Sequence, residues 1–196
     1  MKHLKKIGFA TALTFSLLAS SVSASAATHT VKSGDTFWNI GMKYGVPVLK
    51  LMEVNNRTSD MIYPGEELEI PESVSSQEKE LLARLVHAEA KGEPYEGKVA
   101  VATVVLNRVD SSEFPDSIKD VIYEKTPGGS YAFSPVGNDQ INKPADEESK
   151  RAVDEALSFR GQGEGSLFFF NPDKSSNQFM MSREVTTVIG NHRFTK

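Results

Sequence analysis

Glu89 is the residue of this sequence with the clearest potential for chemistry. The residues before it predict a helix with one apolar stripe, and Glu89 continues that stripe after Leu85 and Val86. A carboxyl group in an apolar surface loses hydration, which disfavours its charged form and raises its pKa. Such a group holds a proton near neutral pH and can deliver it to a glycosidic oxygen. Periodicity alone also allows a glutamate that points to water and pairs with Lys91 or Lys98.

A second carboxylate would be expected if Glu89 worked in the two-acid scheme of many glycosidases. The available acids are Glu93, Glu96, Asp139, Asp173 and Glu184, and none stands in a distinctive context. Gly92 and Pro94 flank Glu93, so the helix that carries Glu89 is expected to end before it. A single acid favours a reaction in which the substrate supplies its own nucleophile, since intramolecular attack reaches effective molarities of about 10⁵ M or more.

A metal site is the other chemistry that these residues suggest. The string His87-Ala88-Glu89 contains two ligand types, but beyond the first 26 residues only His29 and His192 remain as further imidazoles. The chain has no cysteine, which excludes thiolate zinc sites and thiol catalysis. The sequence therefore predicts neither a metal nor a cofactor.

The first 26 residues predict a cleaved export signal. Lys2, Lys5 and Lys6 precede an apolar run over residues 7–18, and Ala24-Ser25-Ala26 fits a signal-peptidase site. A transmembrane anchor is the alternative, but the apolar run is too short to cross about 30 Å of hydrocarbon. We therefore expect an exported protein, and the absence of cysteine suits the exterior of a Gram-positive bacterium, where folding cannot rely on disulfide catalysts.

The charge of the chain excludes several partners. Removal of residues 1–26 takes away three lysines and no acid, so the net charge falls from −4 to −7. A mildly acidic chain without basic runs argues against nucleic acid or an anionic membrane as the partner. Recognition by hydrogen bonding and shape is expected instead.

Residues 28–71 predict a small βααβ module. We expect a strand at 30–32, a helix at 36–44 capped by Asp35, a second helix that begins beyond Pro47 and ends at Asn55-Asn56, and a strand at 67–70. The turn residues also have purely structural explanations: a positive φ at Gly34, a helix cap at Asp35 and a core position for Trp38.

This segment resembles a LysM domain. The resemblance rests on Thr30-Val31-Lys32-Ser33-Gly34-Asp35-Thr36-Phe37-Trp38-Asn39-Ile40, Tyr44-Gly45-Val46, Asn55-Asn56 and Ile62-Tyr63-Pro64-Gly65-Glu66-Glu67-Leu68. It implies binding of N-acetylglucosamine-containing glycan between the turn at 34–37 and the loop at 55–62. The implied glycan-binding residues are Gly34, Asp35, Thr36, Asn55 and Ile62.

A polar linker at 72–76 then leads to a second domain at 77–196. Ser75 and Glu78 form a capping box that opens a helix to about Ala90. The length and the alanines of 95–109 favour a buried helix, although its β-branched residues also allow a strand. Further helices are expected at 116–123 with Asp116 as the cap, and at 144–159 opened by Pro144. Strands are expected at 166–170, 184–189 and 193–195. The fold class is therefore α+β, with a lysozyme-like, mainly helical domain and a small antiparallel sheet.

The second domain resembles the spore-cortex-lytic enzyme (SleB/CwlJ) family of cell-wall hydrolases. The resemblance covers residues 76–194 and rests on the run from Arg84 to Arg108, Phe133-Ser134-Pro135-Val136, Phe168-Phe169-Phe170-Asn171-Pro172 and Ile189-Gly190-Asn191-His192-Arg193-Phe194. It implies a lytic transglycosylase that cleaves the MurNAc–GlcNAc strand of peptidoglycan. Glu89 matches the family's catalytic glutamate, and the muramic acid 6-hydroxyl would be the internal nucleophile.

Three loop residues are candidates for contacts with the sugar: Phe133, Gln140 and Asn171. Their structural alternatives are a core position for Phe133 and a turn before Pro172 for Asn171. The hydroxyl of Thr103 is expected to bond back to its own helix. The expected function is cleavage of peptidoglycan in spore cortex lysis and germination or in wall remodelling. The alternatives are a non-catalytic wall- or spore-coat-binding protein and an N-acetylmuramoyl-L-alanine amidase.

Overall fold

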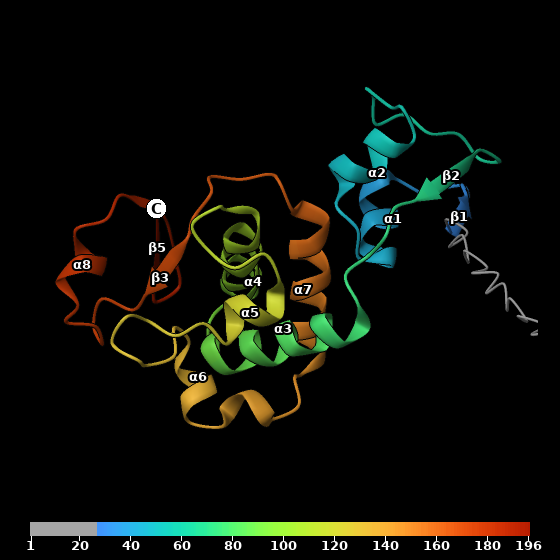
Figure 1. Cartoon of the computed structure of the whole chain (residues 1–196). Helices are drawn as coiled ribbons and strands as arrows, with labels where there is room; N and C mark the ends of the chain where they lie inside the picture. The colour runs from blue at the N-terminus through green and yellow to red at the C-terminus, as the bar shows by residue number, and fades with distance from the viewer. Residues whose placement is uncertain (1–26) are drawn as a thin grey trace, which may run out of the picture.

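The computed structural model describes residues 27–196, so the expected export signal at 1–26 lies outside the described residues. Two bodies follow one another along the chain (Figure 1). The N-terminal body comprises β1, α1, α2 and β2, and the C-terminal body comprises the elements from α3 to β5. No helix within the described part of the chain is long and apolar enough to cross a membrane.

The N-terminal body has the predicted βααβ order. Its elements are β1 (Ala27–Thr30), α1 (Phe37–Tyr44), α2 (Val48–Val54) and β2 (Glu67–Ile70). The two strands pair antiparallel, with Ala27 opposite Ile70 and Thr30 opposite Glu67. A small buried core holds the body together and consists of Val31, Phe37, Ile40, Val46, Leu51, Leu68 and Ile70.

Two details of this body correct the sequence prediction. The first strand lies at Ala27–Thr30 rather than at 30–32, because Lys32 already belongs to the turn that Asp35 closes. The N-cap of α1 is Thr36, whose hydroxyl accepts the Asn39 N–H at 3.0 Å. Asp35 does not cap the helix, because its carboxylate accepts the Lys32 N–H and pairs with the His29 ring, each at 2.8 Å.

The C-terminal body places its helices first and a three-stranded antiparallel sheet, in the order β3-β5-β4, at its end. Its elements are α3 (Ser76–Glu89), α4 (Tyr95–Asp110), α5 (Ile118–Ile122), α6 (Ser134–Gly137), a 3-10 helix (Gln140–Asn142), α7 (Glu147–Phe159), β3 (Phe168–Phe170), α8 (Gln178–Met181), β4 (Val185–Ile189) and β5 (His192–Thr195). This arrangement confirms the predicted α+β class. The short elements α6, α8 and the 3-10 helix were not predicted.

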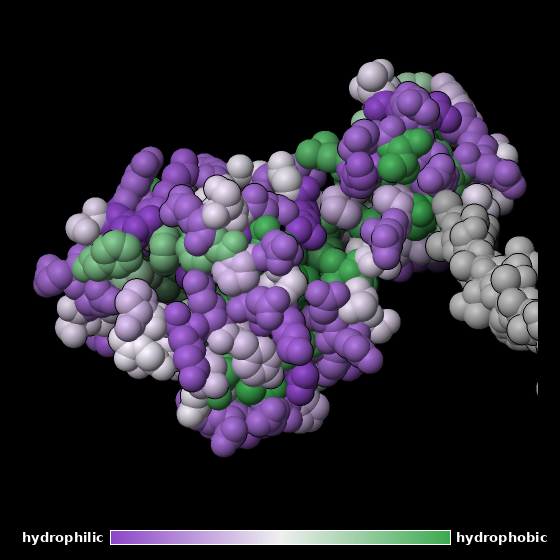
Figure 2. All heavy atoms as spheres, viewed as in Figure 1, coloured by the Kyte–Doolittle hydropathy of each residue, from purple (hydrophilic) through white to green (hydrophobic). Residues whose placement is uncertain are grey.

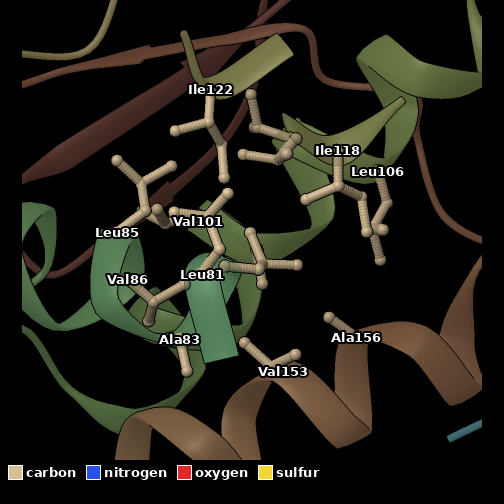
Figure 3. Close-up of a cluster of buried hydrophobic side chains, with 14 of the residues drawn as sticks. Leu81, Ala83, Leu85, Val86, Val101, Leu106, Ile118, Ile122, Val153 and Ala156 are labelled. Atoms are coloured by element: carbon tan, nitrogen blue, oxygen red, sulfur yellow. The ribbon is translucent and has the colours of Figure 1, made fainter. Parts of the chain in front are cut away.

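The core of this body lies where α3 meets α4, α5 and α7 (Figure 3). Leu85 and Val86 of α3, Val101 of α4 and Ile122 of α5 are fully buried there. Burial of each such side chain contributes roughly 1.5–3 kcal/mol of hydrophobic free energy. The apolar stripe that leads to Glu89 is therefore anchored in the core of the C-terminal body.

The ends of the helices confirm one predicted cap and correct two. The Ser75 hydroxyl accepts the Glu78 N–H at 3.2 Å and donates to the Glu78 carboxylate at 2.7 Å, as a capping box requires. Ser117, and not Asp116, caps α5. The helix predicted to open at Pro144 begins at Glu147, because the Asp146 carboxylate accepts the Ser149 N–H at 2.7 Å and so provides the cap.

The two bodies contact each other through α1 and α7. The rings of Trp38 and Phe159 meet edge to face, with 6.1 Å between their centroids. Beside them Lys79 pairs with Asp154 at 2.8 Å, and a Cβ at Gly45 would overlap the Lys79 ammonium. The N-terminal body is therefore seated on the C-terminal body. The predicted domain boundaries, 28–71, 72–76 and 77–196, stay predictions.

Candidate active site

Glu89 is the last residue of α3 and points its carboxyl group into a partly buried environment. Burial raises its pKa from 4.5 to about 7, although a hydrogen bond from the Ser134 backbone N–H lowers it. Lys98, one of its possible partners, pairs with Glu148 instead. The side chain is therefore desolvated, as its place on the apolar stripe indicated, and it exchanges its proton near neutral pH.

A cavity of about 590 Å³ opens beside Glu89, within the size range of small-molecule and cofactor sites. Four parts of the chain form it: the ends of α3 and α4, the loop between α4 and α5, the loop between α5 and α6 with the start of α6, and β3 with α8 and the residue before it. Figure 2 shows apolar side chains at the surface of the end of the molecule where Figure 1 places β3 and α8. The lining residues are Glu89, Arg108, Phe114, Glu124, Lys125, Thr126, Pro127, Tyr131, Ala132, Phe133, Ser134, Phe168, Phe169, Phe170, Asn177, Phe179 and Met180.

Arg108 and Glu124 bring opposite charges to this cavity. The Arg108 side chain is only 7% exposed, and its Nε donates to the Leu167 carbonyl at 2.8 Å. Burial lowers the pKa of Arg108 to about 10, and the charge of Glu124 opposes that shift. The cavity thus combines a protonated acid near neutral pH, a cation and a second carboxylate within largely apolar walls.

Of the predicted sugar contacts, Phe133 lines the cavity while Gln140 and Asn171 lie outside its lining. Phe133 is 3% exposed and its ring lies 5.0 Å from the Arg108 guanidinium, so it serves the core and the cavity wall together. Gln140 is exposed on the 3-10 helix. Asn171 forms a turn, in which its side chain accepts the Asp173 N–H at 2.9 Å. Thr103 donates to the Val99 carbonyl at 2.9 Å, as expected for a helix hydroxyl.

The acids considered as partners of Glu89 also lie outside the cavity lining: Glu93, Glu96, Asp139, Asp173 and Glu184. Glu93 accepts both the backbone N–H and the side-chain amide of Asn191, at 2.8 and 3.0 Å, and so pins the β4–β5 turn to the loop after Glu89. His87 lies 3.1 Å from Asp146. Within residues 27–196, no group of three or more potential ligand side chains is arranged to hold a metal ion.

The predicted glycan-binding residues of the N-terminal body fall into two groups. Gly34 and Thr36 are exposed in the turn before α1, and Gly34 has a φ of 89°. The other three also support the fold. Asn55 donates to the Leu51 and Glu69 carbonyls and accepts the Glu69 N–H, each at 2.8 Å. Ile62 packs against the small core, and Asp35 binds His29.

Arg108 and Glu124 were missed by the sequence reasoning. Arg108 follows Val101 and Val104 at the same helical spacing that singled out Glu89, so the periodicity contained its signal. Glu124 stands just after the short α5, at the start of an irregular loop, and nothing local distinguishes it from other exposed acids. Only the packing of that loop against β3 and α8 brings it to the cavity.

Comparison with known proteins agrees with this fold. A model of the cell wall hydrolase family matches residues 92–195, and a LysM domain model matches residues 29–71. Because the first match covers more than half of the chain, the chain belongs to the cell wall hydrolase family. Glu89 precedes the matched segment, so its role rests on the geometry described above.

The curated relatives and solved structures that this chain resembles are consistent with this family. The chain is 40% identical over 125 residues to a spore cortex-lytic enzyme of Halalkalibacterium halodurans, which covers 64% of this chain and 36% of the relative. The corresponding enzyme of Bacillus subtilis is 38% identical over 64% of this chain and 39% of its own length. The chain thus spans less than half the length of these relatives. A solved catalytic domain of the germination-specific lytic transglycosylase SleB from Bacillus anthracis matches with a TM-score of 0.58 and 36% identity, over 65% of this chain and all of that domain.

One further relative bears on the amidase alternative. The N-acetylmuramoyl-L-alanine amidase sle1 of Staphylococcus epidermidis is 43% identical over 74 residues, which covers 38% of this chain and 22% of the amidase. The match to the spore cortex-lytic enzymes is longer. The comparisons therefore favour glycan cleavage over amide cleavage.

Proposed function

We propose that this chain is a secreted enzyme that binds peptidoglycan through residues 28–71 and cleaves the MurNAc–GlcNAc strand in the cavity at Glu89. The site of action is the cell wall or the spore envelope, in cortex lysis during germination or in wall remodelling. The observation that carries the proposal is a desolvated glutamate with a pKa of about 7 in a cavity of 590 Å³. The matches to a LysM domain and to spore cortex-lytic enzymes support the substrate class.

The reaction that fits this site is a lytic transglycosylation. Glu89 donates its proton to the glycosidic oxygen as the bond from that oxygen to C1 of the muramic residue breaks. The Glu89 carboxylate then accepts the proton of the 6-hydroxyl of the same residue while that oxygen bonds to C1. The products are a 1,6-anhydromuramoyl end and a free hydroxyl on the leaving sugar. Glu89 regains its proton, and no water is consumed.

Glu124 favours hydrolysis as a second candidate reaction. It lines the same cavity as Glu89, so a carboxylate is present that can activate a water molecule in the scheme of inverting glycosidases. The product would then be a reducing muramic acid end. Lytic transglycosylation remains the favoured reaction, because the SleB catalytic domain that this chain matches at 36% identity is described as a lytic transglycosylase.

Digestion of purified peptidoglycan in ¹⁸O-water separates the two reactions. Anhydro ends free of ¹⁸O are the expected result, whereas reducing ends that carry ¹⁸O would establish hydrolysis. Release of peptides without new glycan ends would refute both and establish the amidase. Intact binding to the wall without any cleavage would establish a non-catalytic wall- or spore-coat-binding protein.

Substitution of the acid tests its role directly. Glu89→Gln removes the transferable proton and is expected to lower the rate of cleavage by at least about 10²–10⁴-fold. Glu113→Gln, at an exposed acid outside the cavity lining, is the matched control and should retain the normal rate. A folded Glu89→Gln chain with near-normal turnover would reject Glu89 as the acid.

A further inference from the structure

Two exposed aromatic side chains stand on different walls of the Glu89 cavity. Tyr131 belongs to the loop between α5 and α6 and is 37% exposed, while Phe179 belongs to α8 and is 59% exposed. Most large aromatic side chains in this body are buried or half-buried, so exposure at a cavity lining marks these two.

Each of these rings is accompanied by a cation that lies over it. The Lys125 ammonium lies 5.1 Å from the centre of the Tyr131 ring, and the two residues also pair through their backbones. The Arg183 guanidinium lies 4.9 Å from the Phe179 ring and 3.9 Å from the Phe168 ring. These contacts stabilise the orientation of the two rings.

The Arg183 guanidinium packs on two aromatic rings at once. Its Nε is buried and has no hydrogen-bond partner within the part of the chain that the structure describes. Phe179 is held from a second side by Phe168, edge to face at 6.1 Å. The Asn177 side chain accepts the Phe179 N–H at 3.0 Å and fixes the start of α8.

We propose that Tyr131 and Phe179 are stacking platforms for the pyranose rings of the glycan strand on either side of the bond to be cleaved. This proposal rests on the proposed function and names the residues that position its substrate. The apolar C–H face of a pyranose ring suits an aromatic face, whereas its hydroxyls suit the polar rim of a cavity. The rings bind the sugar and do not take part in proton transfer.

Kinetics on soluble, peptide-free glycan of alternating GlcNAc and MurNAc test the platforms. Tyr131→Ala and Phe179→Ala are each expected to raise KM by about threefold to tenfold with little change in kcat, which is the range for an aromatic contact. Phe179→Tyr should restore KM, whereas Phe179→Leu, which keeps apolar packing without a ring, should not. Tyr123→Ala is the matched control, because Tyr123 is an exposed tyrosine outside the cavity lining.

A fluorescence titration tests stacking without any need for cleavage. Trp38 is the only tryptophan of the chain and lies on α1. Phe179→Trp in a Glu89→Gln chain adds an indole at the cavity, and binding of the GlcNAc-MurNAc tetrasaccharide is expected to shift its emission to the blue. The Glu89→Gln chain alone supplies the Trp38 background for subtraction.

The outcomes separate this proposal from the proposed function. A fall in kcat at constant KM, full activity of Phe179→Leu, or an indole that does not respond to the tetrasaccharide would each overturn the platforms. If the native chain cleaves no glycan but the indole responds, the cleavage proposal fails and the stacking surface stands. If the chain cleaves glycan and the indole does not respond, only the platforms fail.

Discussion

Glu89→Gln is expected to make the folded chain more stable at alkaline pH and to leave its stability unchanged near pH 4. Burial raises the pKa of Glu89 from 4.5 to about 7, so between these values the folded state binds more protons than the unfolded state. The free energy of unfolding of the native chain therefore falls as the pH rises through this window. Glutamine has the same shape and keeps an oxygen that accepts the Ser134 N–H. Because it carries no charge, its burial does not destabilise the folded state as the pH rises.

The magnitude follows from the two pKa values. The interval from 4.5 to about 7, at about 1.4 kcal/mol for each pH unit, gives roughly 3–4 kcal/mol above pH 7. Glu89 is partly exposed, and solvent screening reduces this figure, so we expect a gain of about 2–3 kcal/mol. Urea unfolding of both chains between about pH 4 and pH 8.5, followed by circular dichroism, measures the difference at each pH.

Glu93→Gln provides a control, because its expected effect on stability is opposite in sign to that of Glu89→Gln. Burial raises the pKa of Glu93, but the two hydrogen bonds from Asn191 and the charges of His192 and Lys174 together outweigh it and lower that pKa. Its carboxylate therefore stabilises the fold above the unfolded pKa, and Glu93→Gln should lose stability at neutral pH, with a loss that shrinks as the pH falls. A Glu89→Gln difference that stays constant or reverses with rising pH would refute the desolvation of Glu89.

Three further predictions address activity, attachment and the contact between the bodies. The rate of glycan cleavage should fall as the pH rises through about 7, where Glu89 loses its proton, and a rate that is flat from pH 6 to pH 9 in a fragment-release assay would contradict this. Deletion of residues 28–71 should weaken attachment to insoluble wall by on the order of 100-fold but spare cleavage of soluble fragments, and equal pull-down of both chains by sacculi would speak against it. Phe159→Ala should expose the Trp38 indole to water and shift its emission to the red, whereas Tyr123→Ala should leave the emission unchanged.

Most of the fold could be predicted from the sequence, because periodic apolar residues and paired capping residues indicate its elements. The strand at Glu67–Ile70, the Ser75 capping box and the apolar stripe up to Glu89 each consist of several residues that agree with one another. Three helix starts were misplaced, because neighbouring residues can each supply a capping oxygen. Whether Asp35 or Thr36 caps α1 depends on His29, a residue of β1 whose ring pairs with the Asp35 carboxylate.

The cavity was predictable only in part, because contacts between distant segments create it. Glu89 was identifiable since its environment is set by its own helix. Glu124 becomes a site residue only when its loop packs near β3 and α8, which lie more than 40 residues further along the chain. Asn171 and Gln140 lie in loops whose composition is typical of sugar-binding sites. The neighbouring residues in the sequence do not determine whether such a loop faces the cavity.

The contact between α1 and α7 has a consequence for the length of substrate. Trp38 against Phe159, together with Gly45 packed closely against Lys79, holds the N-terminal body on one side of the molecule, and the β3 and α8 walls of the cavity lie at the opposite end (Figure 1). Folded protein, and not a flexible tether, then separates a sugar held at the turn before α1 from a bond held at Glu89. A glycan must exceed a threshold length before it engages both, and shorter fragments occupy one at a time. The affinity of the chain for glycan should therefore increase sharply at this threshold number of sugars. Weakening the α1–α7 contact should make the increase gradual.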